Sequence, residues 1–152
     1  MRVKFFILLA AVILLAFAAT GCNSREIKAS TRTSTKTDQP ATPADDVKRI
    51  SIEDARVAFD GGSAVMIDVR GEPSYKAGHI KGAKLIPYNE IGDRAGELPK
   101  DKLIILYCSC PAEHSSVAAA QVLKGKSVEN TAALVGGFPK WQEAGYPTEK
   151  SQ

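Results

Sequence analysis

The strongest constraint on the fold is the uninterrupted apolar run Leu103-Ile104-Ile105-Leu106-Tyr107. Successive residues of a strand point to opposite faces, so this strand would be apolar on both faces. Such a strand must be covered on both sides, as in a parallel sheet flanked by helices. Ala64–Val69 has the same character, and shorter strands are predicted at Lys84–Pro87 and Thr131–Val135. The chain is therefore predicted to contain a buried, mainly parallel sheet.

Helices are predicted between these strands. Ser51 is expected to cap a short helix that runs through Phe59, because the acidic Asp54 lies at the third position of that helix. The alanine-rich segment Ser115–Lys124 predicts a second helix. Phe138–Ala144 predicts a third, short helix. Strands and helices alternate, which is typical of an α/β fold with helices on both faces of the sheet.

Residues 1–21 have the pattern of a lipoprotein-type signal peptide. Arg2 and Lys4 precede the apolar run Phe5–Ala19, which is shorter than the roughly 20 residues of a membrane span. The segment Ala19–Cys22 resembles a bacterial lipobox, with alanine in place of the usual first leucine. That resemblance implies that Cys22 becomes the lipidated, palmitate-bearing first residue of the mature chain. Plain cleaved secretion and an uncleaved membrane anchor are the alternatives.

The predicted location is the bacterial cell envelope, with the protein held by its lipid on the periplasmic or extracellular side. Asn23 follows Cys22 where an aspartate would resemble an inner-membrane retention signal, which favours the outer membrane where the cell has one. Residues 22–47 are rich in Ser, Thr, Lys, Asp, Pro and Ala and are predicted to form a disordered tether. One folded domain is expected over residues 48–150.

Charge and composition exclude several classes of function. The 20 Lys and Arg residues exceed the 17 Asp and Glu residues by only three. Removal of Arg2 and Lys4 with the signal peptide leaves 18 against 17. This balance predicts no binding of nucleic acid. The three cysteines are too few for a disulfide scaffold, and no cofactor is predicted.

The segment Cys108–Ser115 joins the buried strand to the start of a helix, where parallel sheets bind their ligands. Backbone N–H groups and the macrodipole at a helix start favour a thiolate, the reactive form of cysteine. We therefore predict that Cys108 and Cys110 are catalytic, although two buried, unreactive cysteines would leave the same pattern. The other residues of this loop are expected to bind substrate: Ser109, Pro111, Ala112, Glu113, His114 and Ser115.

Several short motifs between Ser51 and Thr148 resemble, in order and spacing, the rhodanese family of sulfurtransferases. The matching residues are Asp68–Arg70, Tyr75–Ala83, Leu98–Lys102, Tyr107–Cys108, Gly136–Trp141 and Gly145–Pro147. The resemblance implies a three-layer α/β sandwich. It also implies that a loop cysteine takes a sulfane sulfur from a small donor, namely thiosulfate, a polysulfide or a persulfide. The resulting persulfide then passes its sulfur to a thiol acceptor.

The loop departs from the family pattern, in which an arginine closes a loop of six residues. No arginine is present, and Glu113 lies five residues after Cys108, where it is expected to repel a dianionic donor. Counting from the strand assigns Cys108 to the catalytic position, whereas loop length assigns Cys110. The strand alignment is preferred here, and the choice stays open.

Two further functions remain open. Thiols as close as Cys108 and Cys110 are expected to form an easily reduced disulfide, which suits a thiol–disulfide redox protein. Loss of the loop arginine also suits an inactive binding module. Asp68 and Arg70 are also expected among the residues of the active loop and substrate site, where they pair with each other or orient the loop, and His79 is expected to be structural. No metal site is predicted, because the Cys and His spacing matches no standard zinc pattern.

Overall fold

The computed structural model describes residues 46–151. The predicted signal peptide, Cys22 and nearly all of the predicted tether lie outside these residues. Within residues 46–151, no helix combines the length and apolar character needed to cross a bilayer.

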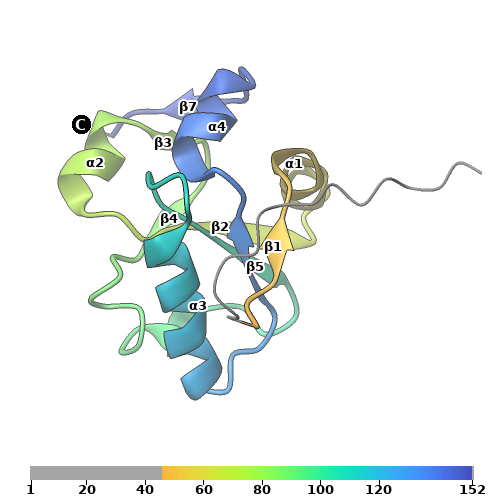
Figure 1. Cartoon of the computed structure of the whole chain (residues 1–152), viewed down its shortest axis with the longest axis vertical. Helices are drawn as coiled ribbons and strands as arrows, with labels where there is room; N and C mark the ends of the chain where they lie inside the picture. The colour runs from red at the N-terminus through yellow and green to blue at the C-terminus, as the bar shows by residue number, and fades with distance from the viewer. Residues whose placement is uncertain (1–45, 152) are drawn as a thin grey trace, which may run out of the picture. The chain divides into compact units, whose positions relative to one another are not determined.

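The centre of the molecule is a five-stranded sheet in which every pair of neighbouring strands is parallel (Figure 1). Its spatial order is β1-β6-β5-β2-β4. The strands are β1 (Arg49–Ile50), β2 (Ala64–Asp68), β4 (Lys84–Leu85), β5 (Leu103–Tyr107) and β6 (Thr131–Leu134). The apolar strand β5 lies in the middle, as predicted, because both of its faces must be covered.

Helices cover both faces of this sheet. On one face, α1 (Ile52–Asp60) and α4 (Gly137–Glu143) pack against Ile105 and Tyr107 of β5 in a cluster that includes the buried Trp141. On the other face, α3 (His114–Gly125) packs against Ile104 and Leu106. Alternate residues of β5 therefore belong to opposite layers, and the predicted α/β class with covered faces is confirmed.

The remaining elements are short. α2 (Glu72–Ala77) begins after Gly71, and η1 (Ala95–Glu97) is a single 3₁₀ turn. β3 (His79–Ile80) and β7 (Thr148–Glu149) form a separate antiparallel pair. The sequence analysis did not predict β1, α2, β3, η1 or β7, because so few residues carry little periodicity, whereas the equally short β4 lies within the predicted strand Lys84–Pro87.

The parallel arrangement places the carboxyl ends of the strands at one edge of the sheet. β2 ends at Asp68, β5 ends immediately before Cys108, and β6 ends two residues before Gly136. The segments that follow these three strands therefore lie next to one another and build the candidate site.

Candidate active site

The two loop cysteines are in direct contact. Their Sγ atoms lie 2.6 Å apart, and both thiols are free. The Cys108 side chain is buried, with the residue only 2% exposed, whereas Cys110 is partly exposed. A small molecule that approaches from solvent therefore meets Cys110 first.

The surroundings of the two thiols shift their pKa values in opposite directions. Burial raises the pKa of Cys108, and the hydrogen bond with Cys110 raises it further. Burial also acts to raise the pKa of Cys110, but hydrogen bonds from Cys108, Ser115 and the backbone of His114 outweigh it and lower that pKa. When one of the two thiols ionises, Cys110 is therefore the favoured thiolate, and it can accept a hydrogen bond from the thiol of Cys108.

The loop turns sharply into α3 at Glu113, the residue that precedes this helix. Glu113 has a left-handed backbone, with φ of 52°, and its N–H donates to the carbonyl of Cys110 at 3.1 Å. This turn directs the first N–H groups of α3 toward the sulfur of Cys110, consistent with their effect on its pKa. The buried Ser116 hydroxyl lies 3.9 Å from Cys108 Sγ and donates to the Glu113 carbonyl.

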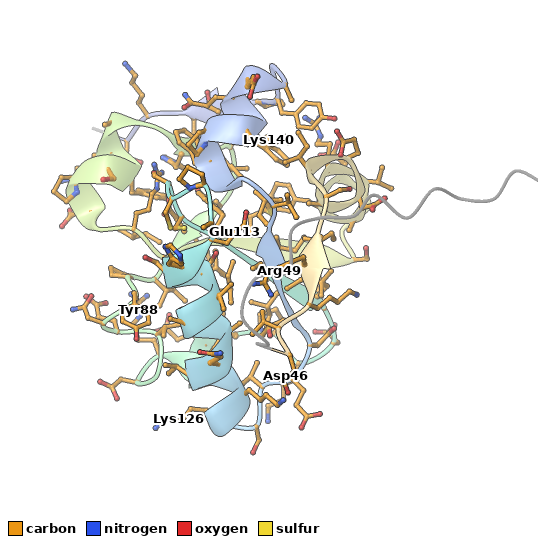
Figure 2. The ribbon with its side chains drawn as sticks, viewed as in Figure 1. Asp46, Arg49, Tyr88, Glu113, Lys126 and Lys140 are labelled. Carbon is orange, nitrogen blue, oxygen red and sulfur yellow. The ribbon has the colours of Figure 1, made fainter. Side chains whose placement is uncertain are left out.

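The Glu113 carboxylate is buried and has specific partners in other elements. Figure 2 labels Glu113 near the start of α3 and Arg49 on β1. It accepts a hydrogen bond of 2.7 Å from the N–H of Gly136, and its other oxygen lies 3.9 Å from Nε of Arg49. The expected repulsion of an anionic donor is therefore reduced, because a backbone donor and a cation already hold this charge. Glu113 joins the loop to β1 and to the turn after β6.

Asp68 and Arg70 form an ion pair at the end of β2. Arg70 donates from Nε and Nη2 to the fully buried Asp68 carboxylate at 2.9 Å and 2.6 Å. Its Nη1 atom donates to the Ser109 hydroxyl at 3.2 Å. The guanidinium also lies over the ring of Phe138, 4.3 Å from its centroid. Arg70 therefore brings a cation to a loop that contains no arginine.

The backbone of the turn after β6 lies against the loop. The N–H of Phe138 donates to the carbonyl of Cys108 at 2.8 Å. A Cβ atom at Gly137 would lie 2.2 Å from that oxygen, and Gly137 has a φ of 55°. Only glycine fits this approach, which explains the glycine at position 137.

The loop residues separate into an exposed and an enclosed group. Ser109, Pro111 and His114 are exposed, whereas Ala112 and Ser115 are partly buried.

Sequence reasoning missed two residues near the loop, Arg49 and Ser116. Arg49 lies in no recognisable motif. Ser116 could have been found as the second of two consecutive serines at the start of the helix.

His79 is buried and contacts Tyr75 and Glu149. Its ring stacks on Tyr75 with centroids 3.6 Å apart, and its Nδ1 lies 2.8 Å from the Tyr75 carbonyl. Across residues 46–151, no group of three or more Cys, His, Asp or Glu residues is arranged to hold a metal ion.

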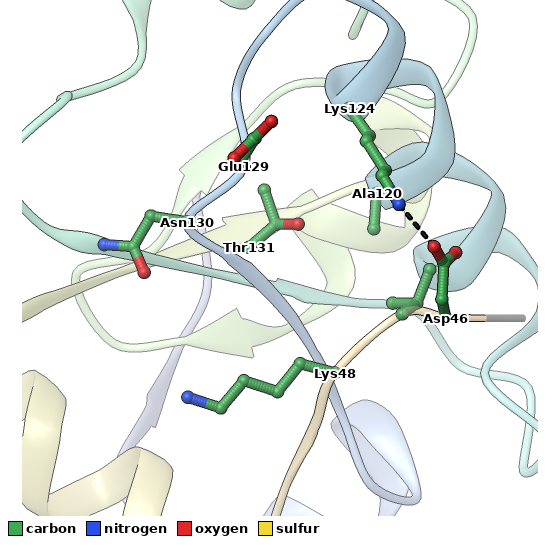
Figure 3. Close-up of a pocket in the computed structure, with 8 residues that line it drawn as sticks. Asp46, Lys48, Ala120, Lys124, Glu129, Asn130 and Thr131 are labelled. Atoms are coloured by element: carbon green, nitrogen blue, oxygen red, sulfur yellow. Dashed lines mark hydrogen bonds and ion pairs between the residues drawn. The ribbon is translucent and has the colours of Figure 1, made fainter.

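A hollow of about 440 Å³ lies at the opposite edge of the sheet (Figure 3). It is lined by the starts of β1 and β6 and by α3 near Lys124. The exposed ion pair between Lys124 and Asp46 crosses one side of it. Parallel strands separate this hollow from Cys108 by the length of the sheet, so it is not part of the cysteine site.

Comparison with known proteins identifies the family. The sequence profile of the Rhodanese-like domain matches residues 51–144. The chain belongs to the rhodanese family. The thiosulfate sulfurtransferase GlpE of Pseudomonas entomophila is 36% identical over 107 residues, which are 69% of this chain and 93% of the relative. The uncharacterized protein YqhL of Bacillus subtilis is 35% identical over 95 residues, covering 62% of this chain and 72% of that protein.

Solved structures agree with this membership. The crystal structure of the BH2092 protein from Bacillus halodurans has a TM-score of 0.62 at 30% identity, covering 68% of this chain and 77% of that chain. The rhodanese-like domain of the Alr3790 protein from Anabaena, solved by NMR, has a TM-score of 0.61 at 27% identity and covers 68% and 79%. These likenesses confirm the predicted rhodanese-like α/β fold.

Proposed function

We propose that this chain is a sulfurtransferase that carries a sulfane sulfur on a thiolate of the Cys108–Ser115 loop. The observation that carries the proposal is the pair of touching thiols beside the N-terminus of α3, whose N–H groups favour a thiolate at Cys110. Membership of the rhodanese family and the GlpE relatives support the same chemistry.

The proposed reaction has two steps. The thiolate attacks the sulfane sulfur of a donor, the donor S–S bond breaks, and sulfite or a thiolate leaves. The new bond leaves a persulfide on the cysteine. A thiol acceptor then removes the outer sulfur and regenerates the cysteine thiolate.

The charged groups near the loop affect which sulfur donor reacts fastest. Arg70 reaches Ser109 but is neutralised by the buried Asp68, and the loop holds no arginine of its own. A dianion such as thiosulfate gains less here than it would from an unpaired arginine fork. We therefore propose that persulfides and polysulfides of thiols react faster than thiosulfate.

The contacts favour Cys110 over Cys108 as the attacking residue. Cys110 is the more exposed thiol, and its pKa is lowered by the hydrogen bonds described above, whereas burial raises the pKa of Cys108. This proposal adopts the alignment by loop length rather than the alignment by strand that the sequence analysis preferred.

The short distance between the sulfur atoms favours one alternative function. Two thiols 2.6 Å apart can act as a dithiol–disulfide couple that transfers electrons without carrying sulfur. Such a couple needs both cysteines for every turnover, whereas a persulfide carrier needs only the attacking one for loading.

We also propose that Cys22 carries a lipid that anchors the chain in the cell envelope. The lipobox-like segment Ala19–Cys22 supports this. Growth with radiolabelled palmitate is expected to label the wild-type chain, whereas the variant Cys22→Ser stays unlabelled. Equal labelling of both would contradict the anchor.

Intact-mass measurement of the full chain tests the sulfurtransferase proposal. Every variant carries Cys22→Ser, so that the two loop thiols are the only ones present. Single variants Cys108→Ser and Cys110→Ser are treated with thiosulfate or glutathione persulfide without reductant. At least one is expected to gain one sulfur, and the variant lacking both loop cysteines gains none. If neither single variant gains sulfur from either donor, the proposal is wrong.

A further inference from the structure

The contact between the sulfur atoms constrains what can follow sulfur loading. Cys110 Sγ lies 2.6 Å from Cys108 Sγ and receives hydrogen bonds from the residues that open α3. An outer sulfur attached to Cys108 on this side would need the space that Cys110 already occupies. An outer sulfur attached to Cys110 can instead extend toward solvent, since Cys110 is the partly exposed residue.

Cys108 has no comparable access to an external partner. The residue is 2% exposed, and its carbonyl is bound by Phe138 of the neighbouring turn. Its sulfur has Cys110 as the nearest sulfur and the Ser116 hydroxyl at 3.9 Å. Its position suits reaction with a group on Cys110 and not with a molecule in solution.

We propose that Cys108 resolves the persulfide formed on Cys110, so that the chain reduces sulfane sulfur to sulfide and is left with a Cys108–Cys110 disulfide. This inference rests on the proposed sulfurtransferase function and specifies the fate of its sulfur. The acceptor of the first turnover is thus a thiol of the chain itself.

The steps balance as follows. The Cys110 thiolate attacks the outer sulfur of a thiol persulfide, the donor S–S bond breaks, and the departing thiolate takes the proton of that sulfur, which leaves a persulfide anion on Cys110. The proton of Cys108 then passes to the outer sulfur of the Cys110 persulfide. The Cys108 thiolate attacks Cys110 Sγ, the persulfide S–S bond breaks, and hydrosulfide leaves with the proton. Two cysteines are oxidised to a disulfide while the sulfane sulfur is reduced, and an external dithiol returns the disulfide to two thiols.

A single-turnover experiment on the reduced full chain tests this order of events. All variants carry Cys22→Ser, and glutathione persulfide is added at one equivalent after removal of reductant. Released sulfide is trapped with monobromobimane, and the intact mass is read from the same sample. The chain with both loop cysteines is expected to release about one equivalent of sulfide and to lose two hydrogen atoms in mass.

The single variants separate the two roles. Cys108→Ser is expected to retain the gained sulfur and to release at least about tenfold less sulfide. Cys110→Ser is expected neither to retain sulfur nor to release sulfide. Cys108→Ala provides a second test without a hydroxyl, and circular dichroism checks that each variant is folded.

Each contrary outcome has a distinct meaning. If the chain with both cysteines keeps the gained sulfur and releases no sulfide, resolution by Cys108 is overturned while sulfur loading stands. If sulfur accumulates on Cys108 in Cys110→Ser, the two roles are reversed and the inference is overturned. If a disulfide forms without sulfide release, the chain is a redox couple. If no variant gains sulfur and no sulfide appears, the sulfurtransferase proposal itself fails.

Discussion

The carboxyl and amino edges of the central sheet differ in whether their ion pairs are buried and in how closely the backbone segments are packed. At the carboxyl edge, the Asp68–Arg70 pair is largely buried, Glu113 adopts a left-handed backbone, and Gly137 lies against the carbonyl of Cys108. The amino edge contains a hollow of about 440 Å³, and the pair Lys124–Asp46 that crosses it is exposed. Enclosed charges and convergent N–H groups, rather than the size of a hollow, therefore mark the candidate site.

The largest expected difference comes from adding a single methyl group. Gly137→Ala would place Cβ 2.2 Å from the Cys108 carbonyl oxygen in a left-handed conformation. We expect the free energy of unfolding to fall by about 4 kcal/mol, from overpacking and backbone strain together. Urea denaturation measures this change, and sulfur loading of the variant should also be lost.

Gly62→Ala is the matched control, because Gly62 also has a positive φ of 72° but no atom lies within 4 Å of its added Cβ. Its cost should be only about 1–2 kcal/mol, the left-handed strain alone. Equal losses at Gly62 and Gly137 would show that the close approach to Cys108 contributes nothing.

The buried ion pair at the carboxyl edge and the exposed ion pair at the amino edge should contribute differently to stability. Arg70→Ala leaves the fully buried Asp68 carboxylate without its cation and should lower the free energy of unfolding by about 3 kcal/mol. Lys124→Ala removes an exposed partner and should produce no measurable change. Thermal and urea unfolding compare the two variants, and similar losses in both would contradict the distinction between the edges.

Glu113 tests whether its buried carboxylate acts as a hydrogen-bond acceptor or through its charge. Glu113→Ala leaves the Gly136 N–H without its partner and should cost about 2 kcal/mol, a typical penalty for an unsatisfied buried donor. Glu113→Gln keeps an acceptor and should cost about 1 kcal/mol. A loss for glutamine as large as that for alanine would identify the charge beside Arg49 as the dominant contribution.

The smallest expected effect concerns the pH dependence of alkylation at the loop. The pKa of Cys110 is lowered by its hydrogen bonds, so its reaction with iodoacetamide should begin at a lower pH than that of an unperturbed cysteine. Lowering the pH through the folded-state pKa protonates Cys110 and slows the reaction. Peptide mass mapping assigns the alkylated residue.

In chains that also carry Cys22→Ser, Cys110→Ser should move the onset of alkylation to higher pH, because burial raises the pKa of Cys108, the one thiol left. An unchanged profile in this variant would show that Cys108 is the thiol that reacts in both chains.

Sequence reasoning identified the apolar strands β2, β5 and β6, the short strand β4 and the helices α1, α3 and α4. The run Leu103–Tyr107 became the central strand β5, and Trp141 and Phe138 of the predicted last helix are buried in the core. β1 and the β3–β7 pair are only two residues long per strand and depend on partners far along the chain. Local pattern cannot identify such strands, because their hydrogen bonds arise from tertiary contacts.

The candidate site shows the same division. The order of motifs placed Cys108 and Cys110 between a buried strand and a helix, which is where the structure has them. The sequence analysis expected Glu113 to affect an anion in the loop, but its carboxylate instead binds Gly136 and faces Arg49. The orientation of one side chain depends on partners 23 and 64 residues away, and spacing within the loop carries no information on it.

The sequence by itself determined the α/β class, the rhodanese resemblance and the position of two cysteines at a strand-to-helix junction. Periodicity and motif order are local properties of the chain, so these conclusions needed no coordinates. Only the tertiary structure decided that the two sulfur atoms touch, that Cys108 is the buried one, and that Arg70 reaches Ser109. Those relations arise when parallel strands bring their carboxyl ends to one edge, and packing there sets which thiol is exposed and which buried charge has a partner.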